Sequence, residues 1–291
     1  ERYMLEVSNL KKIKPYSNSY LLDNMTFHIP KGHICGLIGE NGAGKTTLMR
    51  TLMGLYSSSG SIVIDGCDMR LNEAAAKERL GIVFADDGFF DGNMRLWQIG
   101  KFYGQLYHSF NMELYLNYIE EFGLDKKHKY KKLSKGMKTR TQLSFALSHN
   151  AKMFLFDEPT AGLDPKERIR IRNLISDLSE DRIVLIATHV VSDIEFISKE
   201  ILLMKNGRLV DQDSPENLQK RIYGHVYELC ISQDELAEVK KEYEISNLFR
   251  RDGEIIVRVI ADKCPVKYDA VKVSPTLEDV YLYEFEGVKR R

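Results

Sequence analysis

The chain has 291 residues, of which 43% are hydrophobic and 29% are charged, and its 42 Lys and Arg balance its 42 Asp and Glu. This composition is typical of a globular protein with a large core and room for a smaller second one, and it excludes disordered and collagen-like chains. Zero net charge argues against a binder of bulk DNA or RNA, and the longest apolar runs fall short of the roughly 18 residues of a membrane span.

Residues 1 to about 212 alternate short β-branched strands with longer helical patterns. This rhythm predicts an α/β fold, a mainly parallel sheet covered by helices. Three short, continuous apolar runs predict strands buried on both faces, at 34–38, 153–156 and 182–187. Each run ends in polar residues, and ligands of open α/β sheets lie beyond the carboxyl ends of the strands. We therefore expect the functional site there.

The rest of the chain predicts an insertion and an appendage. Few strand signals occur from about Leu96 to Asn150, so we expect an inserted helical subdomain over about 86–150. Asn206-Gly207, between two apolar runs, predicts a hairpin. Beyond it, a short helix, strands at 226–231 and 254–260 and a closing helix near 276–283 suggest a small α+β accessory domain. The expected domains are residues 1–212 and 213–291.

A glycine-rich loop fits the pattern GxxxxGK[ST] and lies between an apolar strand and a helical run. Glycines let successive backbone N–H groups point into one cavity, and the helix that begins at Lys45 adds the positive end of its dipole. This arrangement suits a polyphosphate: Lys45 would neutralise its outer phosphates and the Thr46 hydroxyl would help to hold Mg²⁺. A glycine-rich turn without a ligand is the alternative. The predicted nucleotide-binding residues are Gly39, Glu40, Asn41, Gly42, Ala43, Gly44, Lys45, Thr46 and Thr47.

Polar residues at the ends of the other two strands complete the predicted site. Asp157 is expected to contact Mg²⁺, directly or indirectly, and Glu158 to polarise a water that attacks the γ-phosphate. Apart from the loop, such an acidic pair is most often a helix cap or a surface turn. His189 ends the next strand and is interpreted as a γ-phosphate sensor rather than an ordinary strand-end residue.

The order of these motifs resembles an ATP-binding-cassette (ABC) ATPase. Residues 133–137 (LSKGM) resemble that family's signature motif, and residues 157–165 (DEPTAGLDP) match its acidic strand end and the loop that follows. Tyr16 lies where the family stacks an aromatic ring on adenine, and Tyr20 is the nearby alternative. The resemblance covers residues 1 to about 212 and implies a P-loop NTPase fold of the ABC-cassette type, with ATP hydrolysis.

The resemblance also implies a head-to-tail pair of cassettes. Each ATP would lie between the phosphate loop of one copy and the signature of the other, so Ser134 and Gly136 would contact the γ-phosphate of the partner's nucleotide. Asp164 would lie at the seam between them. Asp before Pro165 is also a good helix start, and the two interpretations are compatible. A second ATPase subunit, identical or related, is therefore expected.

Two substitutions in the signature motif indicate which branch of the ABC family the chain resembles. Lys135 and Met137 replace the usual Gly and Gln of the signature, a variant that resembles ATPases of drug, sodium, lipid or peptide exporters, and residues 274–282 resemble that branch's closing motif. The resemblance implies an integral membrane permease as partner, a peripheral location on the cytoplasmic face of the membrane, and amphipathic or antimicrobial peptides, drugs or lipids as cargo.

Two questions stay open in the sequence. Ala85 stands where the family has a Mg²⁺-contacting Gln, and we hypothesise that Asp86 or Asp87 takes over that contact or one with the membrane subunit. The alternative function is an ABC-type ATPase working on a non-membrane partner, in iron–sulfur assembly or as a nucleic-acid or ribosome clamp. Long coiled coils or two cassettes in one chain would favour the clamp, but the sequence shows neither, and no nucleic-acid partner is expected.

Overall fold

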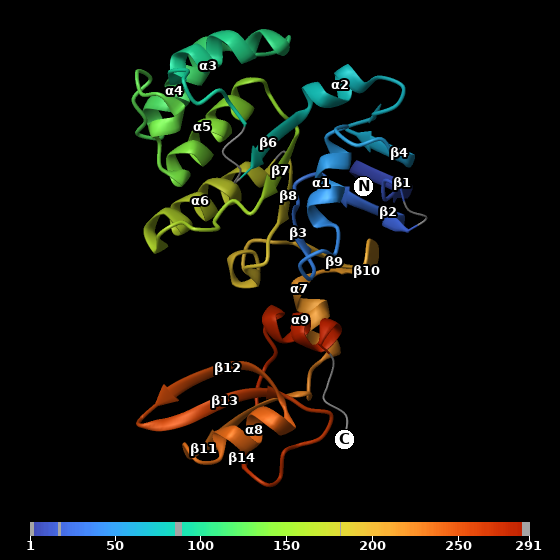
Figure 1. Cartoon of the computed structure of the whole chain (residues 1–291), viewed down its shortest axis with the longest axis vertical. Helices are drawn as coiled ribbons and strands as arrows, with labels where there is room; N and C mark the ends of the chain where they lie inside the picture. The colour runs from blue at the N-terminus through green and yellow to red at the C-terminus, as the bar shows by residue number, and fades with distance from the viewer. Residues whose placement is uncertain (1–2, 17–18, 85–88, 181, 287–291) are drawn as a thin grey trace. The chain divides into compact units, whose positions relative to one another are not determined.

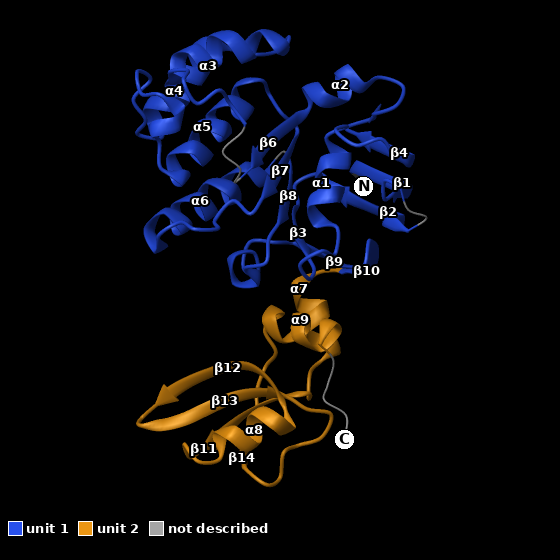
Figure 2. Ribbon diagram, viewed as in Figure 1, with its two compact units in different colours: residues 1–212 blue, residues 213–291 orange. Residues whose placement is uncertain are grey.

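The computed structural model describes residues 3–16, 19–84, 89–180 and 182–286 (Figure 1). The chain divides into two compact units, Glu1–Gln212 and Asp213–Arg291, coloured separately in Figure 2. Within the described ranges, no helix combines the length and the apolar character that a membrane span needs. Ala85, Asp86 and Asp87 lie outside the described residues.

The first unit contains a six-stranded sheet in the order β10-β9-β3-β8-β7-β6. Its strands are β3 (Ile34–Ile38), β6 (Leu80–Phe84), β7 (Met153–Asp157), β8 (Ile183–Ala187), β9 (Glu200–Lys205) and β10 (Arg208–Asp213). Neighbours from β9 to β6 pair in parallel, and the register sets Asp157 opposite Ala187 and Ala187 opposite Leu37. The residues that follow these strands therefore emerge together at one edge, as the buried apolar runs predicted.

A second, antiparallel sheet packs in the same unit, in the order β2-β1-β4-β5. Its strands are β1 (Tyr3–Ile13), β2 (Tyr20–Pro30), β4 (Ser59–Ile64) and β5 (Cys67–Asp68). In β2, buried and exposed side chains alternate, which leaves a face to pack against the core and a face toward solvent. This sheet and the parallel one share one apolar core with helix α1 (Lys45–Leu52), so α1 is held from both sides.

Helices cover the parallel sheet and build the inserted region. They are α2 (Glu73–Glu78), α3 (Leu96–Tyr103), η1 (Gly104–Leu106), α4 (Met112–Glu121), η2 (Tyr130–Lys132), α5 (Lys135–Ser148), α6 (Pro165–Asp177), η3 (Leu178–Glu180) and η4 (Val191–Asp193). Helix α5 is buried over most of its length because it packs on both α4 and β6. Its N-terminus begins at the signature motif.

A buried imidazole in this region makes the stability of the first unit depend on pH. His149 ends α5, is 2% exposed, and has no hydrogen-bond partner for either ring nitrogen among the described residues. Its ring packs on Tyr107, with 4.0 Å between centroids. Burial lowers the pKa of His149 from 6.5 to about 4, against an opposing effect of the Glu78 carboxylate. The neutral ring is therefore the form that the fold accommodates.

Lowering the pH from about 6.5 to about 4 is expected to destabilise the protein. In this range His149 binds a proton in the unfolded state but stays neutral in the folded state. The loss reaches at most about 3 kcal/mol. Urea unfolding at pH 7.5 and pH 5 measures it, and His149→Phe should remove much of the difference. Exposed His128, changed to Gln, is the control. An equal pH dependence in His149→Phe would contradict this account.

The described part of the second unit contains a four-stranded antiparallel sheet in the order β12-β13-β11-β14, together with helices. Its elements are α7 (Pro215–Arg221), β11 (Val226–Ile231), α8 (Leu236–Glu242), β12 (Glu244–Arg251), β13 (Glu254–Ile260), β14 (Asp269–Lys272) and α9 (Leu277–Phe285). A separate apolar core forms around Leu229, Val239 and Val257. Asp279 of α9 is fully buried and bonded to Arg258 of β13, which fastens the closing helix to the sheet.

Candidate nucleotide site

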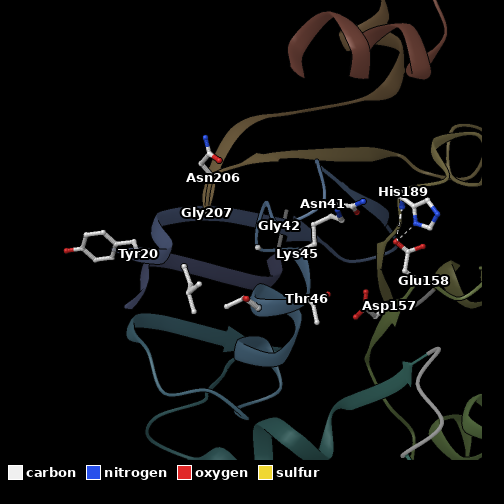
Figure 3. A pocket seen from close by; sticks show the side chains of 13 residues that line it. Tyr20, Asn41, Gly42, Lys45, Thr46, Asp157, Glu158, His189, Asn206 and Gly207 are labelled. Atoms are coloured by element: carbon white, nitrogen blue, oxygen red, sulfur yellow. Dashed lines mark hydrogen bonds and ion pairs between the residues drawn. The ribbon is translucent and has the colours of Figure 1, made fainter. Parts of the chain in front are cut away.

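A cavity of about 730 Å³ opens at the carboxyl ends of β3, β7 and β8 (Figure 3). The phosphate loop and α1 form its floor, the acidic end of β7 and His189 lie at one side, and Tyr20 and the β9–β10 turn lie at the other. The lining residues are Tyr20, Leu21, Asn41, Gly42, Gly44, Lys45, Thr46, Thr47, Asp157, Glu158, His189, Asn206 and Gly207.

Two glycines of the phosphate loop are required by its geometry. Gly44 caps α1 in the left-handed region, at φ 104°, a conformation that favours glycine. A Cβ on Gly39 would lie 2.2 Å from the carbonyl oxygen of Met204, so only glycine permits this approach of β9. The loop therefore curls tightly onto the start of α1 and leaves the helix N-terminus facing the cavity.

Lys45 is folded back over the loop. Its Nζ donates hydrogen bonds to the carbonyl oxygens of Gly39 (2.5 Å) and Glu40 (3.1 Å). Burial lowers the pKa of Lys45, while the carboxylates of Glu158 and Asp157 oppose that shift. A partly desolvated ammonium beside backbone N–H groups suits a polyanion, because the anion would restore the lost solvation of the charge.

Asp157 ends β7 beside Thr46, whose side chain hydrogen-bonds to its carboxylate. Burial raises the pKa of Asp157, as does the neighbouring charge of Glu158, whereas Thr46, Arg50 and Lys45 lower it. Two adjacent carboxylates and a hydroxyl are oxygen ligands of the kind that hard divalent cations select. A cation here would relieve the repulsion that raises this pKa.

Glu158 is held by the neighbouring strand. Its backbone has φ 52°, and its N–H donates to the carbonyl of Ala187 at 2.8 Å. The carboxylate accepts hydrogen bonds from the Thr188 hydroxyl (3.3 Å) and the His189 N–H (3.0 Å), and Nδ1 of His189 lies 2.8 Å from Oε1 (Figure 3). The side chain of His189 is 60% exposed and that of Glu158 24% exposed. The pair is therefore fixed at the cavity wall yet open to solvent.

The structure separates the two tyrosines considered for adenine stacking. Tyr20 begins β2 and lines the cavity. Tyr16 is fully exposed and is not among the lining residues of the described chain. The intervening residues 17 and 18 lie outside the described ranges. Three residues of the predicted loop are not among the lining residues either. Gly39 and Ala43 are buried, and Glu40 is half-buried.

The signature residues and Asp164 lie outside the cavity of the chain to which they belong. Ser134 is exposed and caps α5, its Oγ accepting from the N–H of Met137 at 3.3 Å. Gly136 is buried against Glu167, whose Oε2 would lie 2.7 Å from an added Cβ. Asp164 caps α6 ahead of Pro165, as the Asp-Pro pair predicted, and accepts from the N–H of Glu167 at 3.0 Å. Within the part described, none of the three lines the cavity.

Sequence reasoning assigned no role to several residues of the site. Leu21 was not singled out although it lines the cavity. Thr188 lies at the polar end of the strand predicted at 182–187, where the site was expected, but it was given no role, although its hydroxyl donates to the Glu158 carboxylate. Asn206 and Gly207 were identified only as a hairpin, although both line the cavity. No local pattern distinguishes such a turn from any other Asn-Gly turn, because the sheet order alone brings it to the phosphate loop.

Parallel strands that end in a phosphate loop, a half-buried aspartate and a glutamate define a P-loop NTPase. A family model described as ABC transporter matches residues 22–161. The bacitracin transport ATP-binding protein of Enterococcus faecalis is 30% identical, over 87% of this chain and 83% of its own length. The lantibiotic transport ATP-binding protein of Streptococcus pyogenes is 31% identical, over 75% of this chain and 95% of its own length.

Solved structures agree on the fold. Among them is cbiO1 of Clostridium perfringens, part of an ABC transporter complex, with TM-score 0.64 and 26% identity over 75% of this chain and 91% of that one. A dimeric ATP-binding cassette with ADP and Pi has TM-score 0.65 and 22% identity over 72% of this chain and 98% of that one. The chain belongs to the ABC transporter family, as an ATP-binding subunit with ATPase activity. This confirms the prediction of an ABC exporter ATPase from the sequence.

Proposed function

We propose that the chain hydrolyses ATP in the cavity at the ends of β3, β7 and β8 to drive export through a separate membrane subunit. The observation that carries this proposal is the meeting of Lys45, Asp157, Glu158 and His189 around one opening. Lys45 and the N-terminus of α1 bind the phosphates, and the ring of Tyr20 stacks on the adenine base of ATP. The residues that bind phosphate come from the floor of the cavity and those that activate water from one side of it, so a phosphate chain on the floor faces both.

Glu158 is the proposed general base. Its carboxylate is oriented by Thr188 and His189, and it accepts a proton from a water aimed at the γ-phosphate. His189 reaches the same region from β8 and senses the γ-phosphate while holding Glu158 through Nδ1. Asp157 and Thr46 would hold Mg²⁺, which would neutralise charge that develops on the transferring phosphoryl group.

The second half of the site is proposed to come from another copy or a related subunit. Ser134 is exposed at the N-terminus of α5, a 14-residue helix, where an anion is favoured by the helix dipole and the unpaired N–H groups. Asp164 is exposed at the start of α6, and the first turn of that helix packs through Glu167 against Gly136 of α5. Neither lines the chain's own cavity, which supports their role across a dimer seam. Gly136 is buried against Glu167, so it would contact a partner's nucleotide only through its backbone N–H.

An integral membrane permease is the proposed partner, and amphipathic or antimicrobial peptides are the proposed cargo. The cargo rests on the relatives, whose names specify bacitracin and lantibiotic transport and linearmycin resistance. The permease contact is proposed on the inserted helical region, where Phe102 is 59% and Leu106 71% exposed. The chain would then work as a peripheral protein on the cytoplasmic face of the membrane.

Replacing Tyr20 with Ala is expected to raise the KM for ATP about tenfold, because base stacking on an aromatic ring is lost. Tyr16→Ala is the matched control and should leave the KM unchanged, since Tyr16 lies outside the cavity. Steady-state phosphate release at varied ATP concentration measures both. A larger rise in KM for Tyr16→Ala than for Tyr20→Ala would assign the stacking role to Tyr16.

Isolation of the complex from membranes in mild detergent tests the proposed function. An integral subunit should copurify, identified by mass spectrometry, and amphipathic peptides should stimulate ATP hydrolysis by the complex. Copurification with soluble partners alone would reject the permease. Hydrolysis that responds to sodium ions or small drugs but to no peptide would reject the proposed cargo while leaving the ATPase intact.

A further inference from the structure

The Asn206-Gly207 turn between β9 and β10 contacts the phosphate loop directly. The Gly207 N–H donates a hydrogen bond of 2.8 Å to the carbonyl oxygen of Ala43. Asn206 and Gly207 have φ values of 50° and 77°, as in a tight hairpin turn whose two central residues are left-handed. Figure 3 shows this turn to the left of Gly42, and all three residues line the cavity.

The same turn is fixed on its other side to β2. The Gly207 carbonyl accepts a hydrogen bond of 2.8 Å from the N–H of Asp23. Arg208 binds the Asp23 carboxylate through Nε (2.8 Å) and a terminal nitrogen (2.5 Å). The turn therefore joins β2 to the phosphate loop and has little freedom to move away from it.

From this contact we infer that the β9–β10 turn is a positioning element for phosphate binding. A trans peptide holds its C=O and N–H groups antiparallel. The Ala43 carbonyl and the Gly44 N–H belong to the same peptide group. Because Gly207 holds the carbonyl by a hydrogen bond, it also fixes the direction of the Gly44 N–H, and Gly44 lines the cavity. That N–H is a donor to the phosphate chain. The inference rests on the proposed ATP site, and it assigns Gly207 a role that acts through the Ala43–Gly44 peptide.

The inference explains why this turn must carry glycine. A Cβ on Gly207 would lie 2.5 Å from the carbonyl oxygen of Leu21, and φ 77° is strained for any L side chain. Gly207→Ala must therefore push the turn off β2 and shift its hydrogen bond to Ala43. Small displacements of binding groups are costly when the ligand is charged and its donors are fixed.

Titration calorimetry with Mg-ATP on the full chain tests this inference. Gly207→Ala should raise the Kd at least about tenfold without changing the stoichiometry, and the KM should rise by more than kcat falls. A loss of fold alone would lower the stoichiometry instead. The matched control is Gly253→Ala in the second unit, where φ is 90° but the added Cβ meets nothing within 4 Å. It should bind ATP as the unaltered chain does.

Arg208→Met provides a second route if Gly207→Ala fails to fold. This change removes the hydrogen bonds from Arg208 to the Asp23 carboxylate and leaves Gly207 in place. A rise in the Kd for Mg-ATP of about two- to fivefold is expected. Its control is Arg251→Met, which removes a surface ion pair with Glu228 in the second unit. If Gly207→Ala and Arg208→Met fold and their Kd values for Mg-ATP equal those of their controls, the inference is overturned. Lys45→Met separates the two proposals, since normal ATP binding by that variant would reject the proposed site itself.

Discussion

Glu158→Gln is expected to slow ATP hydrolysis by about 10²- to 10⁴-fold while ATP still binds. Gln has nearly the same shape, and its single side-chain oxygen can still accept from the His189 N–H, as Oε1 does. Its NH2 group takes the place of Oε2 beside the Thr188 hydroxyl, and the amide takes no proton from water. Phosphate release under saturating ATP measures the rate, and titration with ATP measures binding. Because hydrolysis would no longer separate the subunits, an ATP-dependent dimer should accumulate in size-exclusion chromatography.

The control for this variant is Glu216→Gln, an exposed carboxylate on a helix of the second unit. It should hydrolyse ATP at the rate of the unaltered chain. Unchanged turnover in Glu158→Gln would reject the general-base role. Loss of ATP binding together with hydrolysis would show instead that Glu158 maintains the shape of the cavity.

Asp279→Ala is expected to destabilise the second unit by about 3–5 kcal/mol, because it leaves a largely buried guanidinium without its main partner. The Asp279 carboxylate is fully buried and accepts from Arg258 Nε at 3.0 Å and from the N–H of Thr276 at 2.8 Å. Thr276 and Asp279 also form a capping box that starts α9. Urea unfolding measures the loss.

Exposed Glu278→Ala, on the same helical turn, is the matched control and should cost less than about 1 kcal/mol. Burial alone would raise the pKa of Asp279, but hydrogen bonds from Arg258 lower it overall. The stability that this group contributes is therefore present above the unfolded pKa near 3.8 and is lost as the pH falls through the lower folded pKa. A stable Asp279→Ala variant would show that the ion pair is dispensable.

The parallel strands could be predicted from the sequence because both of their faces are buried. The runs at 34–38, 153–156 and 182–187 differ from β3, β7 and β8 by at most one residue at an end. The antiparallel sheet of β1, β2 and β4 was not predicted, since its strands are only half buried and β1 pairs with the distant β4 as well as with its neighbour β2. Strand β12 was not predicted either, because its side chains are exposed or half-buried and its apolar pattern is therefore weak.

Local motifs account for only part of the candidate site. The phosphate loop is contiguous, so its glycines, Lys45 and Thr46 can be read from a short segment. The turn at Gly207 and the hydroxyl of Thr188 reach the site through sheet order and strand register, which no short segment encodes. Tyr16 and Tyr20 lie close in sequence, and only the start of β2 places Tyr20 at the cavity.

Mixing two inactive variants tests the central claim, that ATP is hydrolysed between the phosphate loop of one chain and the signature of another. Lys45→Met removes the phosphate-binding ammonium, and Ser134→Arg blocks the exposed cap of α5. A mixed pair retains one complete site, formed by the intact loop of one variant and the intact signature of the other. The account predicts that mixing restores phosphate release well above the sum of the separate variants. Release equal to that sum, with mixed pairs demonstrated, would contradict it.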